Sequence, residues 1–173
     1  MIKLVIIADD LTGALDTGVQ FSKKNISTIV TADLNFNAEE ISKDADVIVI
    51  DTESRHISAA EAKKRVKSVL SKFDKKKIKF FYKKTDSTLR GNIGSEIEGF
   101  MEGLDINEVS FIPAFPLSKR TVKDGILYGG AYYTMDYCLV HAKHSYEGQF
   151  SYFEGNCKIG NGQYGNNIYY FRG

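Results

Sequence analysis

The sequence has few of the features that mark disulfide-rich, nucleic-acid-binding or membrane proteins. Its 173 residues include only two cysteines, Cys138 and Cys157, which are too few for a disulfide framework and too far apart for a zinc site. Lysine and arginine number 23 against 22 aspartates and glutamates, so the net charge of +1 gives no overall attraction to nucleic acid or to an acidic membrane. No segment approaches the ~20 apolar residues of a membrane span, and the apolar run at the start is too short for a signal peptide. We therefore expect a cytoplasmic protein without nucleic-acid or membrane partners.

Apolar residues alternate along the chain between strand-like and helix-like patterns. Strands are predicted at 3–8, 26–31, 47–51, 78–83 and 109–113, and helical spacing predicts helices around 14–21, 62–73 and 93–104. The second helix has a clear start, because the Ser58 hydroxyl can accept from a backbone N–H and Glu61 can reach back to the Ser58 amide. The order strand, helix, strand, repeated, predicts an α/β fold: a Rossmann-like parallel sheet with helices on both faces.

The composition changes near residue 128. Of the ten tyrosines and fifteen glycines, eight of each lie after that point, whereas only six of the 45 charged residues do. We therefore divide the chain into a domain at 1–128 and an irregular Tyr/Gly-rich tail at 129–173. The tail has no amphipathic helix to cover a sheet, and poor order and an irregular β appendage both remain open for it.

Polar residues gather directly after the predicted strands. In a parallel sheet, ligands bind beyond the carboxyl ends of the strands, so these residues are the candidate site. They are Asp9, Asp10, Thr12 and Gly13 after the first strand, Arg55 after the third, and Lys84, Thr85, Asp86, Ser87 and Arg90 after the fourth. The cations, together with the amides of a helix beginning near Asn92, suit a carboxylate or a phosphate. The carboxylates suit substrate hydroxyls or a general base.

Each of these residues also has a purely structural interpretation. One aspartate of the first group can simply help to cap a helix whose N-cap we expect at Thr12. The segment 84–90 can be a solvated charged turn, and Arg55 can pair with Asp51 or Glu53. We favour a binding role because four predicted strands end in unusual polar or proline-rich segments, the fifth strand in Pro113-Ala114-Phe115-Pro116.

Other kinds of site find less support in the sequence. Neither Gly-x-Gly-x-x-Gly nor Gly-x-x-x-x-Gly-Lys-Ser/Thr occurs, so no nucleotide site is predicted. His141 and His144 have no third ligand nearby, so no metal site is predicted. A phosphatase of the haloacid dehalogenase type needs Asp-x-Asp after the first strand, where this chain reads Asp-Asp-Leu-Thr.

Three motifs together resemble a known family. They are ADDLTGA at 8–14, KKTDSTLRGNIG at 83–94, and PAFP at 113–116 followed by RTVKDG at 120–125. In this order and spacing they resemble the N-terminal domain of four-carbon acid sugar kinases, once grouped as the domain of unknown function DUF1537. The resemblance covers residue 1 to about residue 128.

The resemblance implies a function for the motifs. The family phosphorylates threonate, erythronate and 3-oxo-tetronate with ATP and Mg²⁺, its N-terminal domain holding the sugar acid and its C-terminal domain the nucleotide. It thus implies that the ten residues of the candidate site bind the sugar acid, and it leaves the catalytic base unassigned.

The chain departs from the family after residue 128, where a second domain would follow. We therefore expect this chain alone to bind no cofactor and to be inactive as a kinase. A truncated gene whose last residues come from a changed reading frame would explain the tail. An isolated domain completed by a separate ATP-binding chain is the other possibility, and a homo-oligomer is also open. The alternative is a non-catalytic remnant or small-molecule binding module.

Overall fold

The computed structural model describes residues 2–41, 43–87, 89–112, 114–115, 120–123, 126–129, 133–136, 140–141 and 168–171. In chain order its elements are β1 (Leu4–Ala8), α1 (Leu11–Ser22), β2 (Thr28–Thr31), α2 (Ala38–Ile41), β3 (Val47–Asp51), α3 (Ala59–Ser71), β4 (Phe80–Lys84), α4 (Ile93–Leu104), β5 (Ser110–Phe111), β6 (Arg120–Lys123), β7 (Ile126–Gly129), β8 (Tyr133–Asp136), β9 (Val140–His141) and β10 (Ile168–Phe171). The predicted strands and helices of the first 111 residues are therefore present, within a few residues of their expected bounds, and the short helix α2 is an addition.

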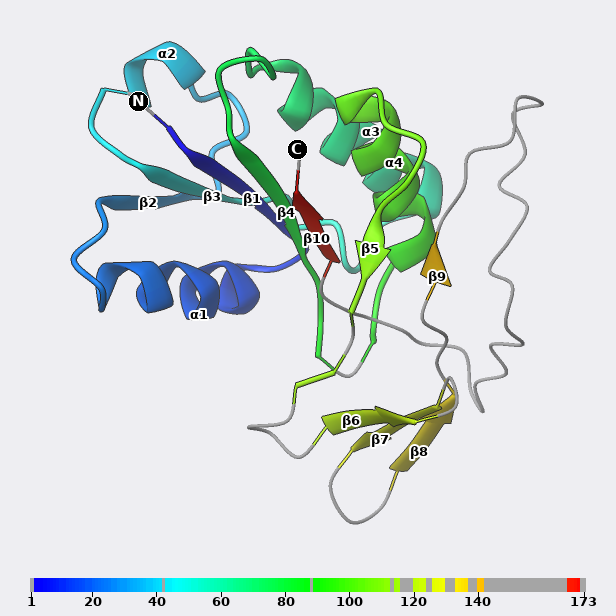
Figure 1. Cartoon of the computed structure of the whole chain (residues 1–173). Helices are drawn as coiled ribbons and strands as arrows, with labels where there is room; N and C mark the ends of the chain where they lie inside the picture. The colour runs from blue at the N-terminus through cyan, green and yellow to red at the C-terminus, as the bar shows by residue number, and fades with distance from the viewer. Residues whose placement is uncertain are drawn as a thin grey trace.

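Four parallel strands, in the order β2-β3-β1-β4, form the part of the main sheet that matters for the candidate site (Figure 1). Ala8 at the end of β1 pairs with Asp51 of β3 on one side and with Lys84 of β4 on the other. The three strands therefore end in one row, and the polar residues that follow them start from the same edge of the sheet.

Beyond β4 the sheet continues in the order β10-β5-β9. Strand β10 is antiparallel to both β4 and β5, so β5 runs in the same direction as β4 although the two are not neighbours. Strands β6, β7 and β8 form a separate antiparallel sheet. The parallel arrangement was predicted for the first strands. Strands β6 and β7 were not predicted, since the last expected strand ended at residue 113, and residues 129–173 show no regular strand pattern from which β8, β9 and β10 could be located.

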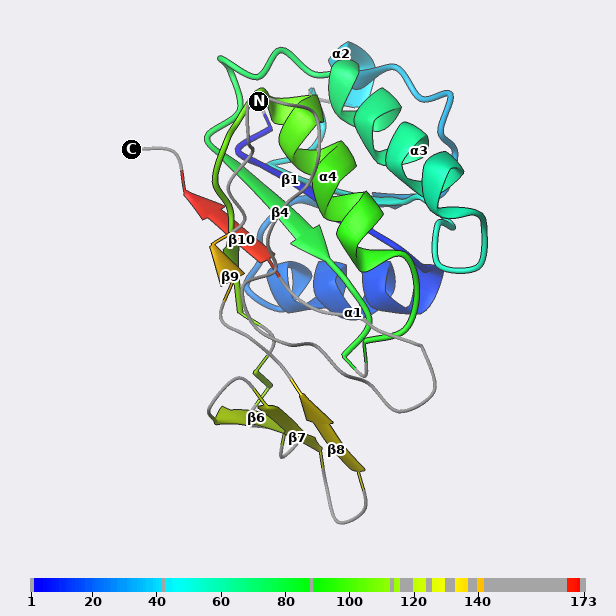
Figure 2. The same cartoon turned by 90° about the vertical axis from the view of Figure 1, so that its right-hand side faces the viewer.

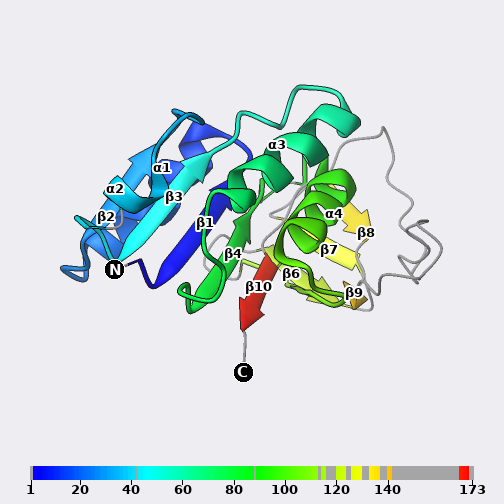
Figure 3. The same cartoon turned by 90° about the horizontal axis from the view of Figure 1, so that it is seen from above.

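Helices cover both faces of the parallel strands, as predicted (Figures 1 and 3). On one face Val5, Ile7, Ile48 and Ile50 pack with residues of α3 and α4, and on the other Ile6, Ala8, Val47 and Val49 pack with Ala14 of α1. Because both faces are buried, β1 and β3 read as nearly continuous apolar runs rather than as an alternating pattern.

Helices α3 and α4 lie side by side, with α4 next to β4 in this view (Figure 2). A Cβ atom at Gly99 of α4 would collide with the Lys63 carbonyl of α3, so the small residue is required for this close approach. Lys63 also joins the two helices through its ammonium, which lies 2.6 Å from Glu98 Oε1 and 2.7 Å from Glu102 Oε1.

The two helix starts discussed from the sequence have different outcomes. Ser58 caps α3 as predicted, with its hydroxyl accepting from the Glu61 N–H at 3.3 Å, while the Glu61 carboxylate lies 3.6 Å from Arg65 Nε. The predicted N-cap Thr12 is wrong: Asp10 caps α1 by accepting from the Gly13 N–H at 2.8 Å, and Thr12 is exposed within the first turn. The side chains of Asp10 and Thr12 can both accept a hydrogen bond from a backbone N–H. The path of the chain after β1 places Asp10, not Thr12, at the position before the first helical residue.

The predicted tail at 129–173 is described only in part. Its described residues are those of β8, β9 and β10 together with Gly129, and both cysteines and His144 lie outside the described residues. Poor order and an irregular β appendage therefore both stay open for most of it. Among the helices that the structure describes, none is long and apolar enough to cross a membrane.

Candidate functional site

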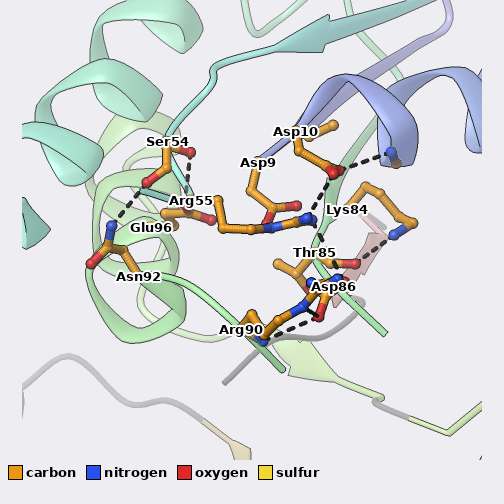
Figure 4. Close-up of polar contacts among 12 residues, drawn as sticks. Asp9, Asp10, Ser54, Arg55, Lys84, Thr85, Asp86, Arg90, Asn92 and Glu96 are labelled. Atoms are coloured by element: carbon orange, nitrogen blue, oxygen red, sulfur yellow. Dashed lines mark hydrogen bonds and ion pairs between the residues drawn. The ribbon is translucent and has the colours of Figure 1, made fainter. Parts of the chain in front are cut away.

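Arg55 lies at the centre of the candidate site, among three carboxylates that come from two different strand ends (Figure 4). Its Nε donates to Asp9 Oδ2 at 2.7 Å, its Nη1 donates to Asp10 Oδ2 at 2.6 Å, and its Nη2 lies 3.7 Å from Asp86 Oδ1. The side chain is 8% exposed. Burial alone would lower the pKa of Arg55, but the hydrogen bond to Asp9 and the charges of the three aspartates raise it.

The path of the backbone after β3 brings Arg55 to this place. The Ser54 and Arg55 N–H groups both donate to the Asp9 carbonyl, at 3.0 and 3.2 Å, and the Thr52 N–H donates to the Ala8 carbonyl at 2.9 Å. The loop after β3 is therefore tied to the end of β1 before any side chain takes part. The structural alternative in which Arg55 pairs with Asp51 or Glu53 is wrong, because this loop carries Arg55 to the neighbouring strand.

Lys84 and Gly13 form the side of the site next to α1. A Cβ atom at Gly13 would lie 2.8 Å from Asp10 Oδ1 and 3.3 Å from Lys84 Nζ, so a side chain there would displace one of the two groups. The Lys84 ammonium donates to the Thr85 carbonyl, a neutral acceptor. Burial lowers the pKa of Lys84, against the charges of Asp9, Asp10 and Asp86.

Asp86 and Arg90 form the outer side of the site. Arg90 donates to Asp86 twice, from Nε to Oδ2 and from Nη2 to Oδ1, both at 2.7 Å, and its side chain is 51% exposed. The planar fork expected to hold a ligand anion is thus engaged by a carboxylate of the same turn. Ser87 Oγ accepts from Arg120 Nη1 at 3.0 Å, which brings the start of β6 to this turn.

The turn between Asp86 and α4 needs unusual backbone conformations. Leu89 has a φ of 70° and Gly91 a φ of 102°. At Gly91 the Arg55 Cα and Cγ atoms would lie 3.4 and 3.1 Å from a Cβ, so glycine serves both the conformation and the close approach. Helix α4 then begins at Ile93 as predicted. The Asn92 side chain does not cap the helix; instead its Nδ2 donates to the Ser54 and Ile57 carbonyls of the loop after β3, at 2.8 Å each.

Three buried oxygen atoms at the strand ends have no hydrogen-bond partner among the described residues: Asp9 Oδ1, Asp51 Oδ2 and Thr85 Oγ1. Asp9 and Thr85 directly follow the paired residues Ala8 and Lys84, so two of the three atoms belong to adjacent strand ends. Burial raises the pKa of Asp9, against the Lys83 charge and the Arg55 hydrogen bond. Burial also raises the pKa of Asp51 to about 7, helped by the charges of Glu53 and Asp10. Buried oxygens of this kind suit ligand hydroxyls, because a polar group without a partner is costly.

Beneath the site lies a buried polar group that the sequence analysis missed. Lys83 and Glu96, 0% and 1% exposed, pair at 2.8 Å, and Glu96 also accepts from the Ser54 hydroxyl at 2.6 Å. A signal was present in the sequence: Glu96 stands within the run of residues 93, 97, 100, 101 and 104, which are buried on α4. A carboxylate on the buried face of a helix calls for a partner.

The structure brings together nine of the ten predicted site residues: Asp9, Asp10, Gly13, Arg55, Lys84, Thr85, Asp86, Ser87 and Arg90. Their contacts are those given above, with Ser87 and Arg90 at the outer edge. Thr12 is not among them: it is exposed in the first turn of α1, and among the described residues no side-chain hydrogen bond or ion pair joins it to the other nine. From the proline-rich segment Ala114 and Phe115 are described, whereas Pro113 and Pro116 lie outside the described residues, as does Thr88.

The fold and the site define an α/β domain with a buried, ion-paired polar site at the carboxyl ends of its parallel strands. The chain belongs to the sugar-binding N-terminal domain family, whose model matches residues 4–145. The family resemblance predicted from the three motifs is thereby confirmed.

The relatives that the chain matches are kinases of four-carbon sugar acids. The D-threonate kinase of Salmonella typhimurium is 40% identical over 124 residues, which are 71% of this chain and 29% of that protein. The D-erythronate kinase of Heliobacterium modesticaldum is 39% identical over 128 residues, which are 73% of this chain and 29% of that protein.

Solved structures agree with the fold. A DUF1537 protein from Bordetella bronchiseptica, crystallised with citrate as a domain-swapped dimer, matches with a TM-score of 0.64 and 33% identity, covering 75% of this chain and 33% of that one. The chain thus spans about a third of the length of the relatives it matches, 29–33% in these three comparisons.

Proposed function

We propose that this chain binds a four-carbon sugar acid of the threonate, erythronate or 3-oxo-tetronate type, as the substrate-binding part of an ATP-dependent kinase. The observation that carries the proposal is the pair of buried, unpartnered oxygens, Asp9 Oδ1 and Thr85 Oγ1, on adjacent strand ends next to Arg55. They are acceptors for hydroxyl groups, inside a site whose other members are charged.

The charges at the site support an acidic ligand. Arg55 and Arg90 are each bonded to carboxylates of the site, whereas Lys84 donates to a neutral carbonyl. A ligand carboxylate would be a direct counter-charge for the partly buried Lys84 ammonium, and the hydroxyls of the same ligand would meet Asp9 and Thr85. A small polyhydroxy acid is the ligand class that uses both features.

The described residues offer little to the Mg²⁺ ion of a nucleotide. Among them there is no group of three or more His, Cys, Asp or Glu side chains that could hold a metal ion, and one oxygen each of Asp9 and Asp10 and both oxygens of Asp86 are bonded to Arg55 or Arg90. We therefore propose that ATP and Mg²⁺ are held elsewhere, as the family resemblance implies, by a second domain or a separate chain. On this proposal residues 1–173 alone bind the acid without phosphorylating it.

Two further parts of the proposal concern location and assembly. Because the reaction consumes ATP, we place the protein in the cytoplasm. The Bordetella relative is a domain-swapped dimer, which supports a homo-oligomer for this protein as well.

The test is calorimetric titration of the purified chain with D-threonate, D-erythronate and ATP separately. We expect one of the acids to bind, ATP to give no signal, and Lys84→Met to weaken acid binding at least about tenfold. Lys79→Met is the matched control, since Lys79 is an exposed lysine just before the opposite end of the same strand. If neither acid binds to folded protein, the proposed function is wrong. In a second experiment the chain is incubated with acid, ATP and Mg²⁺ together. If a phosphorylated acid forms, the proposal that ATP and Mg²⁺ are held by a second domain or a separate chain is wrong.

A further inference from the structure

A buried set of hydrogen bonds runs beneath the candidate site and connects the end of β4, the loop after β3 and helix α4. It begins at Lys83, whose ammonium lies 2.8 Å from Glu96 Oε2 and donates to the Lys84 carbonyl at 3.0 Å. Lys83 belongs to β4 and Glu96 to α4, so this first contact fixes the helix against the strand.

The second oxygen of Glu96 continues towards Arg55. Glu96 Oε1 accepts from Ser54 Oγ at 2.6 Å. Ser54 Oγ lies 2.7 Å from Thr52 Oγ1, but the Thr52 hydroxyl donates its single proton to the Ala8 carbonyl at 2.7 Å, so this last link is a polar contact rather than a hydrogen bond. Glu96, Ser54 and Thr52 are each at most 1% exposed. Strand β4, helix α4 and the loop after β3 are therefore joined through one carboxylate.

Ser54 is the residue directly before Arg55, and its N–H and that of Arg55 share the Asp9 carbonyl. The backbone that carries Arg55 is therefore held at two points, by the Asp9 carbonyl and, through the Ser54 side chain, by Glu96 (Figure 4). We propose that Glu96 is a positioning residue, which acts through Ser54 to hold the Arg55 guanidinium on Asp9 and Asp10. The part of this inference that concerns ligand affinity rests on the proposed function, whereas the positioning of Arg55 does not.

A purely structural role for the Lys83–Glu96 pair is the competing explanation. Buried ion pairs can often be replaced by apolar residues of similar volume without loss of stability, so stability by itself does not account for this pair. The feature that a structural role leaves unexplained is the second bond of Glu96, which leads away from Lys83 and α4 to the loop that carries Arg55.

Two double variants of the full chain separate these explanations. Lys83→Met with Glu96→Gln removes both charges and keeps an acceptor for the Ser54 hydroxyl, whereas Lys83→Met with Glu96→Leu removes the charges and the acceptor. Neither leaves a buried charge unpaired. Each is made with and without Ser54→Ala, and Glu102→Gln, which affects the exposed pairs with Lys63 and Lys67, is the control on the same helix.

The first readout needs no ligand: the NMR signal of Arg55 Nε–Hε, identified by its disappearance in Arg55→Lys. We call the two variants the Met/Gln double and the Met/Leu double, after the residues at positions 83 and 96. We expect the hydrogen exchange of this signal to be about tenfold faster in the Met/Leu double than in the Met/Gln double. Adding Ser54→Ala should accelerate the exchange in the Met/Gln double and leave it unchanged in the Met/Leu double. Equal exchange rates in two folded doubles would overturn the inference. If the Met/Leu double does not fold, Ser54→Ala in the wild-type chain replaces it, and an unchanged Arg55 signal would again overturn the inference.

The second readout is affinity for D-threonate, or for D-erythronate if that is the acid the wild type binds. We expect about tenfold weaker binding for the Met/Leu double than for the Met/Gln double. If the wild type binds neither acid, the proposed function fails and the exchange experiment still decides the role of Glu96. If the wild type binds an acid and both doubles bind it equally, the proposed function stands and the inference fails.

Discussion

Two ion pairs of this domain have similar geometry and very different surroundings. Lys83 and Glu96 pair at 2.8 Å beneath the site and are almost completely buried, whereas Arg90 and Asp86 pair at 2.7 Å at its outer edge, where the Arg90 side chain is half exposed. Water competes with the outer pair and cannot reach the inner one. The inner pair, with its further bonds to Ser54 and the Lys84 carbonyl, therefore suits a fixed framework. Arg90 can leave Asp86 for a ligand more easily, because the buried Asp86 still has the Arg55 guanidinium 3.7 Å away.

The largest expected effect is on the inner pair. Glu96→Gln leaves the Lys83 ammonium buried without a counter-charge, and we expect the free energy of unfolding to fall by about 3–5 kcal/mol. Urea denaturation measures this. The control is Glu102→Gln, whose partners Lys63 and Lys67 are partly exposed, and for which we expect less than about 1 kcal/mol. Similar losses in the two variants would show that burial does not distinguish them.

The next effect concerns the guanidinium at the centre of the site. Arg55→Lys keeps one positive charge but cannot reach Asp9 and Asp10 with two parallel donors, and we expect acid affinity to fall about ten- to a hundredfold. Calorimetry with D-threonate and D-erythronate measures it. Arg90→Lys is the comparison at the outer edge, where we expect a smaller loss. A larger loss for Arg90→Lys would reverse the order of the two regions.

A third effect is a pH dependence that arises from Asp51. The unfolded chain releases this proton near pH 3.8 and the folded chain near pH 7, so between these values the folded state holds more protons and the free energy of unfolding falls as pH rises. Asp51→Asn keeps an acceptor for the Glu53 N–H and cannot ionise. We expect the stability of the variant relative to wild type to increase by roughly 3 kcal/mol between pH 4 and pH 7. A relative stability that does not change over this range would show that Asp51 is ionised at neutral pH in the folded chain.

The smallest effect is expected at the outer pair. Arg90→Gln removes the two bonds to Asp86 at an exposed position, and we expect the free energy of unfolding to change by less than about 1 kcal/mol. Thermal or urea denaturation of Arg90→Gln and Glu96→Gln under the same conditions compares the loss in free energy of unfolding for the two pairs. A loss above about 2 kcal/mol would mean that the outer pair is also part of the framework.

Much of the fold could be predicted from the sequence because its signals are local. The apolar runs at 47–51 and 93–104 coincide with β3 and α4, and Ser58 caps α3 through a bond to a residue three positions away. The choice between Asp10 and Thr12 as the cap of α1 was beyond local reasoning, since both side chains can accept from a backbone N–H. Strand β10 pairs with β4 although 83 residues separate Lys84 from Ile168. A pairing over this distance cannot be predicted from the local sequence of either strand.

The candidate site also has a part that the sequence could predict and a part that it could not. The rule that ligands bind at strand ends was enough to select Asp9, Arg55, Lys84 and Asp86, because the register of parallel strands places their ends in one row. The pairing of Arg55 with Asp9 and Asp10 depends on the path of a loop, and the role of Glu96 depends on which face of α4 meets the sheet. Both are consequences of packing between segments that are more than 40 residues apart, as the contact between Ser54 and Glu96 shows.

The central claim is that a sugar acid binds at the carboxyl ends of β1, β3 and β4. The most direct measurement is a titration of isotope-labelled chain with D-threonate or D-erythronate, followed through the backbone amide signals. We predict saturable shifts concentrated in residues 9–13, 52–56 and 84–91, with the exposed surface of α3 unaffected. Saturable shifts concentrated elsewhere, or no shifts from either acid in a folded chain, would contradict the claim.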